Sequence, residues 1–253
     1  MFAINPFAAL SAMITPAIMQ GYVVAMIALV AAGTLFDVVH KGSARYFFSN
    51  WRKTRNKQIS GGELASIAIQ TAVVDVLASG EFCSARRRAA HLLTMYGFLA
   101  YVVSSVVMVF DPSAAAIWPR LWWLGGLIVC VGGYWFWFFI RADVAAEGNS
   151  PWRVMRADLF IVSLLASVTL GLVWAALQAS GSGSAIVFFT LYILATTVLF
   201  GSVPWSKFAH MFFKPAAAFE KRVSYANGTR GNLPEPAAKP ERFGSARTAP
   251  RHY

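Results

Sequence analysis

The chain has four histidines, and these side chains could take part in the most kinds of chemistry: His40, His91, His210 and His252. A neutral imidazole binds metals and titrates near neutral pH. The first three stand at the ends of apolar runs, where an ionisable side chain is by default a functional hypothesis in a membrane helix. Lys207 precedes His210 by three residues, about one helical turn. His252 lies in a polar segment, and we interpret it as solvated.

The composition indicates a membrane protein. Of the 253 residues, 57% are hydrophobic and only 13% are charged, and the mean hydropathy is +0.55. A soluble domain carries roughly 25% charged residues. The two cysteines, Cys83 and Cys130, form no CxxC pair, so we expect neither a disulfide framework nor an iron–sulfur site of the chain's own.

Apolar runs long enough to cross a bilayer predict an all-α membrane protein, a bundle of five transmembrane helices. We expect the spans at about 16–38, 91–110, 120–140, 157–178 and 185–213, all within a membrane domain at 16–215. Residues 1–40 contain no Lys or Arg, so we interpret the first run as a retained span and not as a signal peptide. Trp118, Trp122 and Trp123 at the start of the third span predict an interfacial belt.

Basic residues set the expected orientation. The net charge is +11, and the cations gather in the loops 41–90 and 141–156 and in the segment 216–253. Because basic loops stay on the cytoplasmic side, we expect the N-terminal residues 1–15 outside and the C-terminus in the cytoplasm. Helical apolar spacing at 62–77 predicts an interfacial helix in the first cytoplasmic loop. The proline-rich, basic tail is expected to be extended or disordered.

This topology brings His40, His91 and His210 to the cytoplasmic ends of their helices. Two histidines from different helices at one depth can ligate one haem iron, and helical bundles hold such cofactors. His91 and His210 are the expected iron ligands. His40 is the weaker alternative, because two ligands already complete an axial pair.

Cations stand about one turn before both expected ligands, where they could bind the haem propionates. They are Arg87 and Arg88 before His91, and Lys207 before His210. Gly97 leaves room for a close-packed ring. In the alternative interpretation the histidines face lipid headgroups and the arginines only fix the topology, and these residues alone leave both interpretations open.

Two motifs resemble the paired signatures of five-span cytochrome b subunits. One reads HLLTMYGF from His91, and the other reads PWSKFAHM from Pro204. The family includes nitrate reductase gamma-like, heterodisulfide reductase-like and Qmo-like membrane subunits, and the resemblance covers about residues 16–215. It implies a subunit that holds haem b and passes electrons between membrane quinone and a cytoplasmic iron–sulfur or flavin enzyme.

Two-haem members of that family carry a second pair of histidines, where this chain has Tyr101 and Tyr192. The resemblance therefore implies one haem, on the cytoplasmic side, and we expect both tyrosines to be packed aromatics. The chain has no fused iron–sulfur domain and in this respect resembles the AprM-type membrane anchors of adenylylsulfate reductase. The implied location is the bacterial inner membrane, in sulfur metabolism.

The expected function is thus that of an electron-transfer subunit of an oxidoreductase complex, either without catalysis of its own or reactive only towards quinone. The expected partners are an adenylylsulfate reductase-like enzyme, quinone and membrane lipid. Nucleic acid is not expected, because the basic tail lacks interleaved aromatic residues. For quinone protonation we favour Lys207 first and His40 second, and we interpret Asp158 as a structural charge. The alternative is a haem-free anchor that only recruits the partner.

Overall fold

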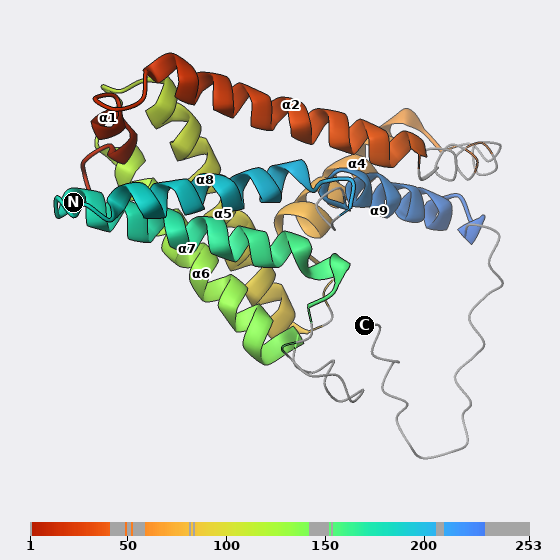
Figure 1. The fold of residues 1–253 in the computed structure, drawn as a ribbon. Coiled ribbons are helices and arrows are strands. Elements are labelled where there is room, and N and C mark those ends of the chain that lie inside the picture. The colour runs from red at the N-terminus through yellow and green to blue at the C-terminus, as the bar shows by residue number, and fades with distance from the viewer. Residues whose placement is uncertain are drawn as a thin grey trace.

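The structure is a computed structural model (Figure 1). It describes residues 2–40, 49, 52, 59–80, 82, 84–141, 152, 154–205 and 210–230, without the side chains of residues 157, 210, 212 and 213. Within these ranges the chain forms helices and turns, and no strand occurs among them.

Four helices of the described chain are long and apolar enough to cross a membrane. They are α2 (Pro16–His40), α5 (Ala85–Phe110), α6 (Ile117–Trp135) continued by η2 (Phe136–Ile140), and α7 (Leu159–Ala179). A shorter apolar helix, α8 (Ala185–Gly201), follows α7. The remaining helices are α1 (Pro6–Leu10), α4 (Gly61–Gln70), η1 (Thr71–Leu77), η4 (Arg156–Asp158) and α9 (His210–Ala226). The chain is therefore a multi-pass membrane protein, as its composition predicts.

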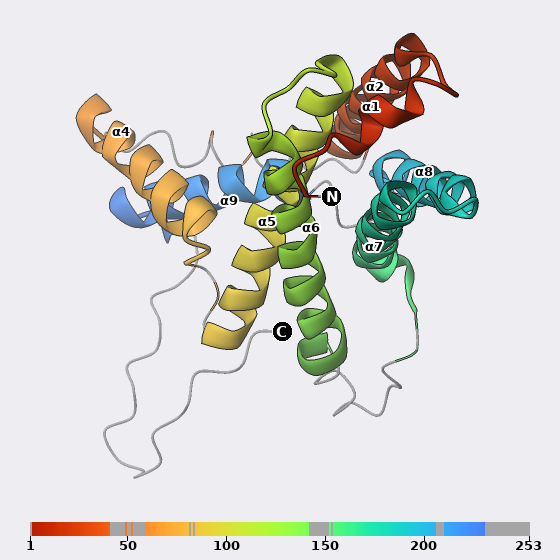
Figure 2. The same ribbon diagram turned by 90° about the vertical axis from the view of Figure 1, so that its left-hand side faces the viewer.

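The bundle is built from two helical hairpins, α5 with α6 and α7 with α8, which make the most extensive contacts between helices. Each pair lies side by side in Figure 2. Helix α2 packs against α8 and α5 at fewer points. Only 11% of its apolar stretch is buried, compared with 50% for α7. Helix α2 is thus the most loosely attached of the long helices.

Glycines bring the backbones of α5 and α6 into close contact. A methyl group on Gly97 would lie 2.8 Å from the carbonyl oxygen of Gly125, and one on Gly125 would lie 2.8 Å from that of Gly97. Gly132 meets Ala90 and Thr94 of α5 in the same way. Small residues permit such close approach between membrane helices, whose association depends on van der Waals packing. The glycine contacts therefore fix how α5 lies against α6.

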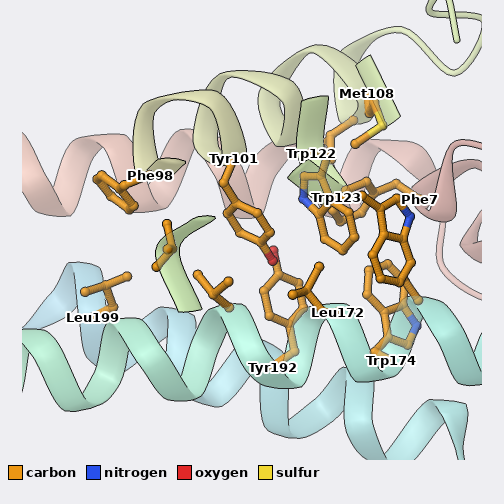
Figure 3. Close-up of a cluster of buried hydrophobic side chains, with 14 of the residues drawn as sticks. Phe7, Phe98, Tyr101, Met108, Trp122, Trp123, Leu172, Trp174, Tyr192 and Leu199 are labelled. Carbon is orange, nitrogen blue, oxygen red and sulfur yellow. The ribbon is translucent and has the colours of Figure 1, made fainter. Parts of the chain in front are cut away.

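An aromatic core joins the two hairpins (Figure 3). Trp122 of α6 stacks on Tyr101 of α5 with a centroid distance of 4.9 Å, and Trp174 of α7 stacks on Tyr192 of α8 at 5.7 Å. The two indoles meet edge to face at 6.5 Å, an arrangement that the ring quadrupoles favour. The expectation that Tyr101 and Tyr192 are packed aromatics is confirmed.

The predicted interfacial tryptophan belt is wrong for two of its three members. Trp122 is 0% exposed and Trp123 is 7% exposed. The indole Nε1 of Trp122 donates a hydrogen bond to Ser105 Oγ at 2.9 Å, so its polar group is satisfied inside the bundle.

Helix α1 closes the end of the bundle at which α2 begins. Asn5 Nδ2 donates to the carbonyl of Met108 at 2.9 Å, and Gln178 Nε2 donates to the carbonyl of Pro6 at 2.6 Å. Phe7 packs edge to face on Trp122 and against Trp174. These contacts tie a five-residue helix to α5, α6 and α7.

The fifth apolar run differs from its predicted form. Helix α8 ends at Gly201 instead of continuing to 213, and the turn 202–205 follows it. Pro204 explains this end, because proline cannot donate in a helix and disfavours helical geometry in the residue before it. A new helix, α9, begins at His210 and continues to Ala226. The tail expected from residue 216 is thus helical as far as 226, and residues 231–253 lie outside the described residues.

The helix predicted at 62–77 exists as α4 followed by η1, and it packs against α9. The guanidinium of Arg222 in α9 binds both carboxylate oxygens of Asp75 in η1, at 2.6 and 2.9 Å. These hydrogen bonds raise the pKa of Arg222 above its usual value. We call α4, η1 and α9 together the lateral layer.

The glycine contacts predict a size limit at the α5–α6 crossing. We expect Gly125→Val to destabilise the detergent-solubilised protein by about 1–3 kcal/mol, because the added carbons meet backbone atoms that cannot move aside. Gly21→Ala is the matched control, since nothing lies within 4 Å of that site, and it should leave stability unchanged or slightly raised. Thermal unfolding followed by size-exclusion chromatography measures both variants, and equal effects would contradict this role for Gly125.

Candidate functional site

Three of the four histidines lie at or near helix ends: His40 is the last residue of α2, His91 lies in the second turn of α5, and His210 is the first residue of α9. The turn after α8 packs on the last third of α2, where a methyl on Gly33 would lie 3.0 Å from Val203 Cβ. At the middle of α5, Phe98 meets Phe200 of α8 at 6.4 Å. The ends of α2 and α8 therefore lie together, towards the right-hand side of Figure 1, and α8 also contacts α5 two helical turns after His91. We call this region the histidine end.

His91 is half-buried on α5 and has a defined polar partner. Its Nδ1 lies 3.0 Å from Ser79 Oγ. The ring of Phe82 covers it at a centroid distance of 4.9 Å. A histidine that ligates a metal almost always donates its other ring N–H to an oxygen acceptor such as a carboxylate, a backbone carbonyl or water, which fixes the tautomer and the orientation of the ring. The Ser79 hydroxyl can act as such an acceptor. His91 therefore fits the role of a metal or haem ligand.

The segment that carries Ser79 is held onto α5 by two further side chains. Arg88 Nε donates to the carbonyl of Ala78 at 2.7 Å, and the hydroxyl of Tyr96 donates to the carbonyl of Leu77 at 2.8 Å. Ser79 itself is 2% exposed and has a positive φ of 50°. We call Leu77, Ala78 and Ser79 the clasp.

The other predicted ligands receive different amounts of support. His210 is the first residue of α9, and its side chain lies outside the described residues. His40 is exposed and stacks on Phe36 of its own helix at 4.8 Å. His40 is thus an exposed residue at the C-terminal end of α2, and its rank as the weaker ligand stays a prediction.

The predicted propionate-binding cations also differ in their surroundings. Arg87 is half-buried on α5, one turn before His91. Arg88 is exposed and directs Nε to the clasp, so part of its guanidinium has a structural role. Lys207 lies outside the described residues.

Gly97 has a different role from the predicted one. The space beside it is filled by the α6 backbone, with Gly125 O and Val129 N within 2.9 Å of the position of an added methyl group. A porphyrin ring cannot lie there, so the glycine serves helix packing. Asp158 behaves as expected: it forms an ion pair with Arg141, whose guanidinium also lies 4.0 Å above the ring of Trp137.

A large apolar cleft lies between α2 and the two hairpins. It has a volume of about 930 Å³ and is lined by residues of α2, α5, α7 and α8. Along α2 its lining runs from Ile18 to Leu35, a distance of about 25 Å, which is most of the thickness of a bilayer core. Ile27 and Leu99 line it and are 58% and 49% exposed, so the cleft opens sideways, towards the surrounding lipid.

Hydroxyl groups occupy the middle of this cleft. Tyr22 of α2 donates to the carbonyl of Ile193 at 3.2 Å and shares a hydrogen bond with Thr197 at 3.0 Å. Tyr101 and Tyr192 point towards one another from opposite helices (Figure 3). The buried Tyr101 Oη makes no hydrogen bond of normal geometry within the described residues, so it can donate to a ligand that enters the cleft.

The cleft reaches the histidine end on two of its walls. Phe98 lines it and lies seven residues after His91 on α5. Seven residues are two helical turns, so both side chains stand on one face, about 10 Å apart along the axis. Met211 also lines the cleft and directly follows His210. Sequence reasoning missed the cleft, although Tyr and Thr residues within apolar spans were a signal for it.

No protein-family model, curated protein or solved structure matches this chain. The resemblance to five-span cytochrome b subunits therefore stays a prediction that rests on the two motifs, and the function has to be inferred from the site itself.

The contacts of Tyr22 predict that one hydroxyl holds α2 against α8. We expect Tyr22→Phe to cost about 0.5–1.5 kcal/mol of stability and to broaden the separation of the two helices. Spin labels at Leu29 and Leu194, in a chain whose native cysteines are replaced, would report that distance. Tyr134→Phe is the control, because its hydroxyl bonds to Thr169 of α7 and not to α2 or α8. A distribution unchanged in Tyr22→Phe would exclude the tether.

Proposed function

We propose that this protein is a membrane electron-transfer subunit that uses one haem b and exchanges electrons with a lipid-soluble quinone. The observation that supports this most directly is the continuity between the cleft and the histidine end. Phe98 and Met211 line the cleft, and each belongs to a helix that carries a proposed ligand, His91 or His210. A quinone in the cleft would thus lie near the proposed cofactor.

His91 and His210 would hold the haem, which would supply reversible one-electron oxidation and reduction. The hydrogen bond between His91 and Ser79 supports His91 as a ligand, because it orients the ring. Arg87, Arg88 and Lys207 would bind the propionates as charge-assisted partners. Gly97 is left out of this assignment.

The cleft suits a molecule with a polar head and a long apolar tail. Its walls are almost entirely hydrocarbon, and its lateral opening would admit a tail directly from the bilayer. The hydroxyl of Tyr101 would donate a hydrogen bond to a quinone carbonyl, and this bond strengthens as negative charge develops on the oxygen. Among the residues of the histidine end, Lys207 and then His40 remain our candidates for proton delivery.

In this proposal α8 is the fifth span, with the N-terminus outside and the histidine end in the cytoplasm of a bacterial cell. Helix α8 has 17 residues, at the lower limit for a membrane span. The lateral layer would lie at the inner surface of the membrane. Ile69, Val73 and Leu77 are at least half exposed and recur every four residues, which is the spacing of an interfacial apolar face.

The proposed partner is a soluble, acidic iron–sulfur or flavin enzyme of the adenylylsulfate reductase kind. Basic residues in the loops 41–90 and 141–156 and in the C-terminal segment favour such a partner, because complementary charge steers and orients encounters. A haem-free anchor would use the same basic surface, so the two functions are distinguished by whether the protein binds haem.

The haem assignment predicts a visible spectrum. We expect the purified protein to show a b-type reduced-minus-oxidised difference spectrum with about one haem per chain, because it has one expected pair of ligands. His91→Ala and His210→Ala should each abolish the spectrum, since each removes an axial ligand. His252→Ala is the control and should retain it. A chain that recruits its partner but shows no haem would identify the anchor function instead.

The quinone assignment predicts that filling the cleft blocks electron exchange. Val102 lines the cleft, whereas its neighbour Val103 does not line it and is 48% exposed. We expect Val102→Trp to slow oxidation of the reduced protein by a soluble quinone analogue at least tenfold, with the haem spectrum unchanged. Val103→Trp should leave the rate as it is. Equal rates in a folded, haem-loaded Val102→Trp protein would exclude the cleft as the quinone site.

A further inference from the structure

We propose that Ser79 is a positioning residue that sets the tautomer of His91: its Oγ accepts a hydrogen bond from Nδ1–H and thereby keeps the ring lone pair on Nε2. The inference deepens the proposed function, on which it rests for the identity of the metal, because Nε2 would then be the iron ligand. The hydrogen bond itself concerns only this chain's own residues.

The first support is the geometry of the pair. Ser79 Oγ lies 3.0 Å from His91 Nδ1, a normal hydrogen-bond distance. Ser79 is 2% exposed, so water does not replace its hydroxyl as a partner. Which ring nitrogen of a neutral histidine carries the proton is set by the hydrogen bond that the ring makes. A buried hydroxyl at Nδ1 is therefore able to select one tautomer.

The second support is that the backbone of the clasp is fixed from several directions. Gly80 N donates to the carbonyl of Val74 at 2.7 Å, and Ala78 N donates to that of Val73 at 2.9 Å. Arg88 and Tyr96 hold the carbonyls of the clasp from the side of α5. These contacts fix the backbone at Ser79, so its Oγ stays within hydrogen-bond reach of His91 Nδ1.

The backbone conformation of Ser79 is the third support. Its φ of 50° lies in the left-handed region, where residues other than glycine, asparagine and aspartate are uncommon. Glycine would adopt this conformation without strain, yet the chain has a serine here. The side chain therefore has a role that offsets its conformational cost, and its hydroxyl forms a hydrogen bond with His91.

The lateral layer links the Ser79–His91 pair to the helix that carries His210, the other proposed ligand. Asp75, four residues before Ser79, binds Arg222 of α9 through two hydrogen bonds. Helix α9 begins at His210. One short segment, η1 with the clasp, thus contacts both helices that carry the proposed ligands and can hold them in a common register.

The positive φ permits an unusually clean test. Ser79→Gly removes the hydroxyl and retains the backbone conformation, because glycine adopts this φ freely. Ser79→Asn also tolerates the left-handed region and restores a side-chain oxygen that can accept a hydrogen bond. Ser84→Gly is the matched control, since Ser84 is exposed and its side chain makes no capping hydrogen bond at the start of α5.

The primary measurement is nitrogen NMR of the haem-free full-length protein with labelled histidine. We expect His91 to carry its proton on Nδ1 in the wild type and in Ser84→Gly, to populate both tautomers in Ser79→Gly, and to return to Nδ1–H in Ser79→Asn. A wild-type proton on Nε2, or a tautomer unchanged in Ser79→Gly, overturns the inference.

The second measurement is haem affinity by titration of the same four proteins. Loss of such an outer hydrogen bond typically weakens metal binding by roughly 10–100-fold, and we expect this loss in Ser79→Gly, partial recovery in Ser79→Asn and no change in Ser84→Gly. Equal haem affinity in Ser79→Gly and the wild type overturns the positioning role. A wild type that binds no haem overturns the proposed function, and the NMR result still decides the tautomer.

Discussion

The close backbone contact between α5 and α6 is the constraint on which the rest of the structure depends. Gly97 and Gly125 remove the side chains that would separate the two helices, and van der Waals packing at that distance fixes their rotation. Helix α5 carries His91, Phe98 and Tyr101, so its rotation decides what faces the cleft and what faces the clasp. The stacking of Tyr101 on Trp122 follows from the same contact, and through Trp122 it extends to the second hairpin.

The two hairpins are packed tightly and α2 is packed loosely, a division that suits the proposed redox function. The two hairpins share an aromatic core in which Trp122 and Trp174 are fully buried, whereas α2 is attached by a hydroxyl tether, a small-residue contact and a few apolar side chains. A rigid frame keeps cofactor ligands in place. A loosely held outer helix leaves apolar volume beside that frame, and the cleft is this volume.

Much of the fold could be predicted, because long apolar runs leave a helix as almost the only choice within a bilayer. Four long helices and the helix at 61–77 lie close to their predicted places. Three features needed three-dimensional information. Trp122 has an internal acceptor in Ser105, Gly97 meets another backbone, and Ser79 reaches His91 across a loop. The end of α8 before His210 was readable from Pro204, whereas one serine in a loop has no periodic signal.

Helix α1 determines from which side a ligand can enter the cleft. Asn5 and Gln178 fasten it to the bundle, and its Phe7 contributes to the cleft wall at the end away from the histidines. That end of the cleft is therefore closed. A quinone bound as proposed would enter the cleft from the side, by moving within the plane of the bilayer. The protein and the quinone would then meet by diffusion in two dimensions, at a rate set by the concentration of quinone in the membrane and not by its solubility in water.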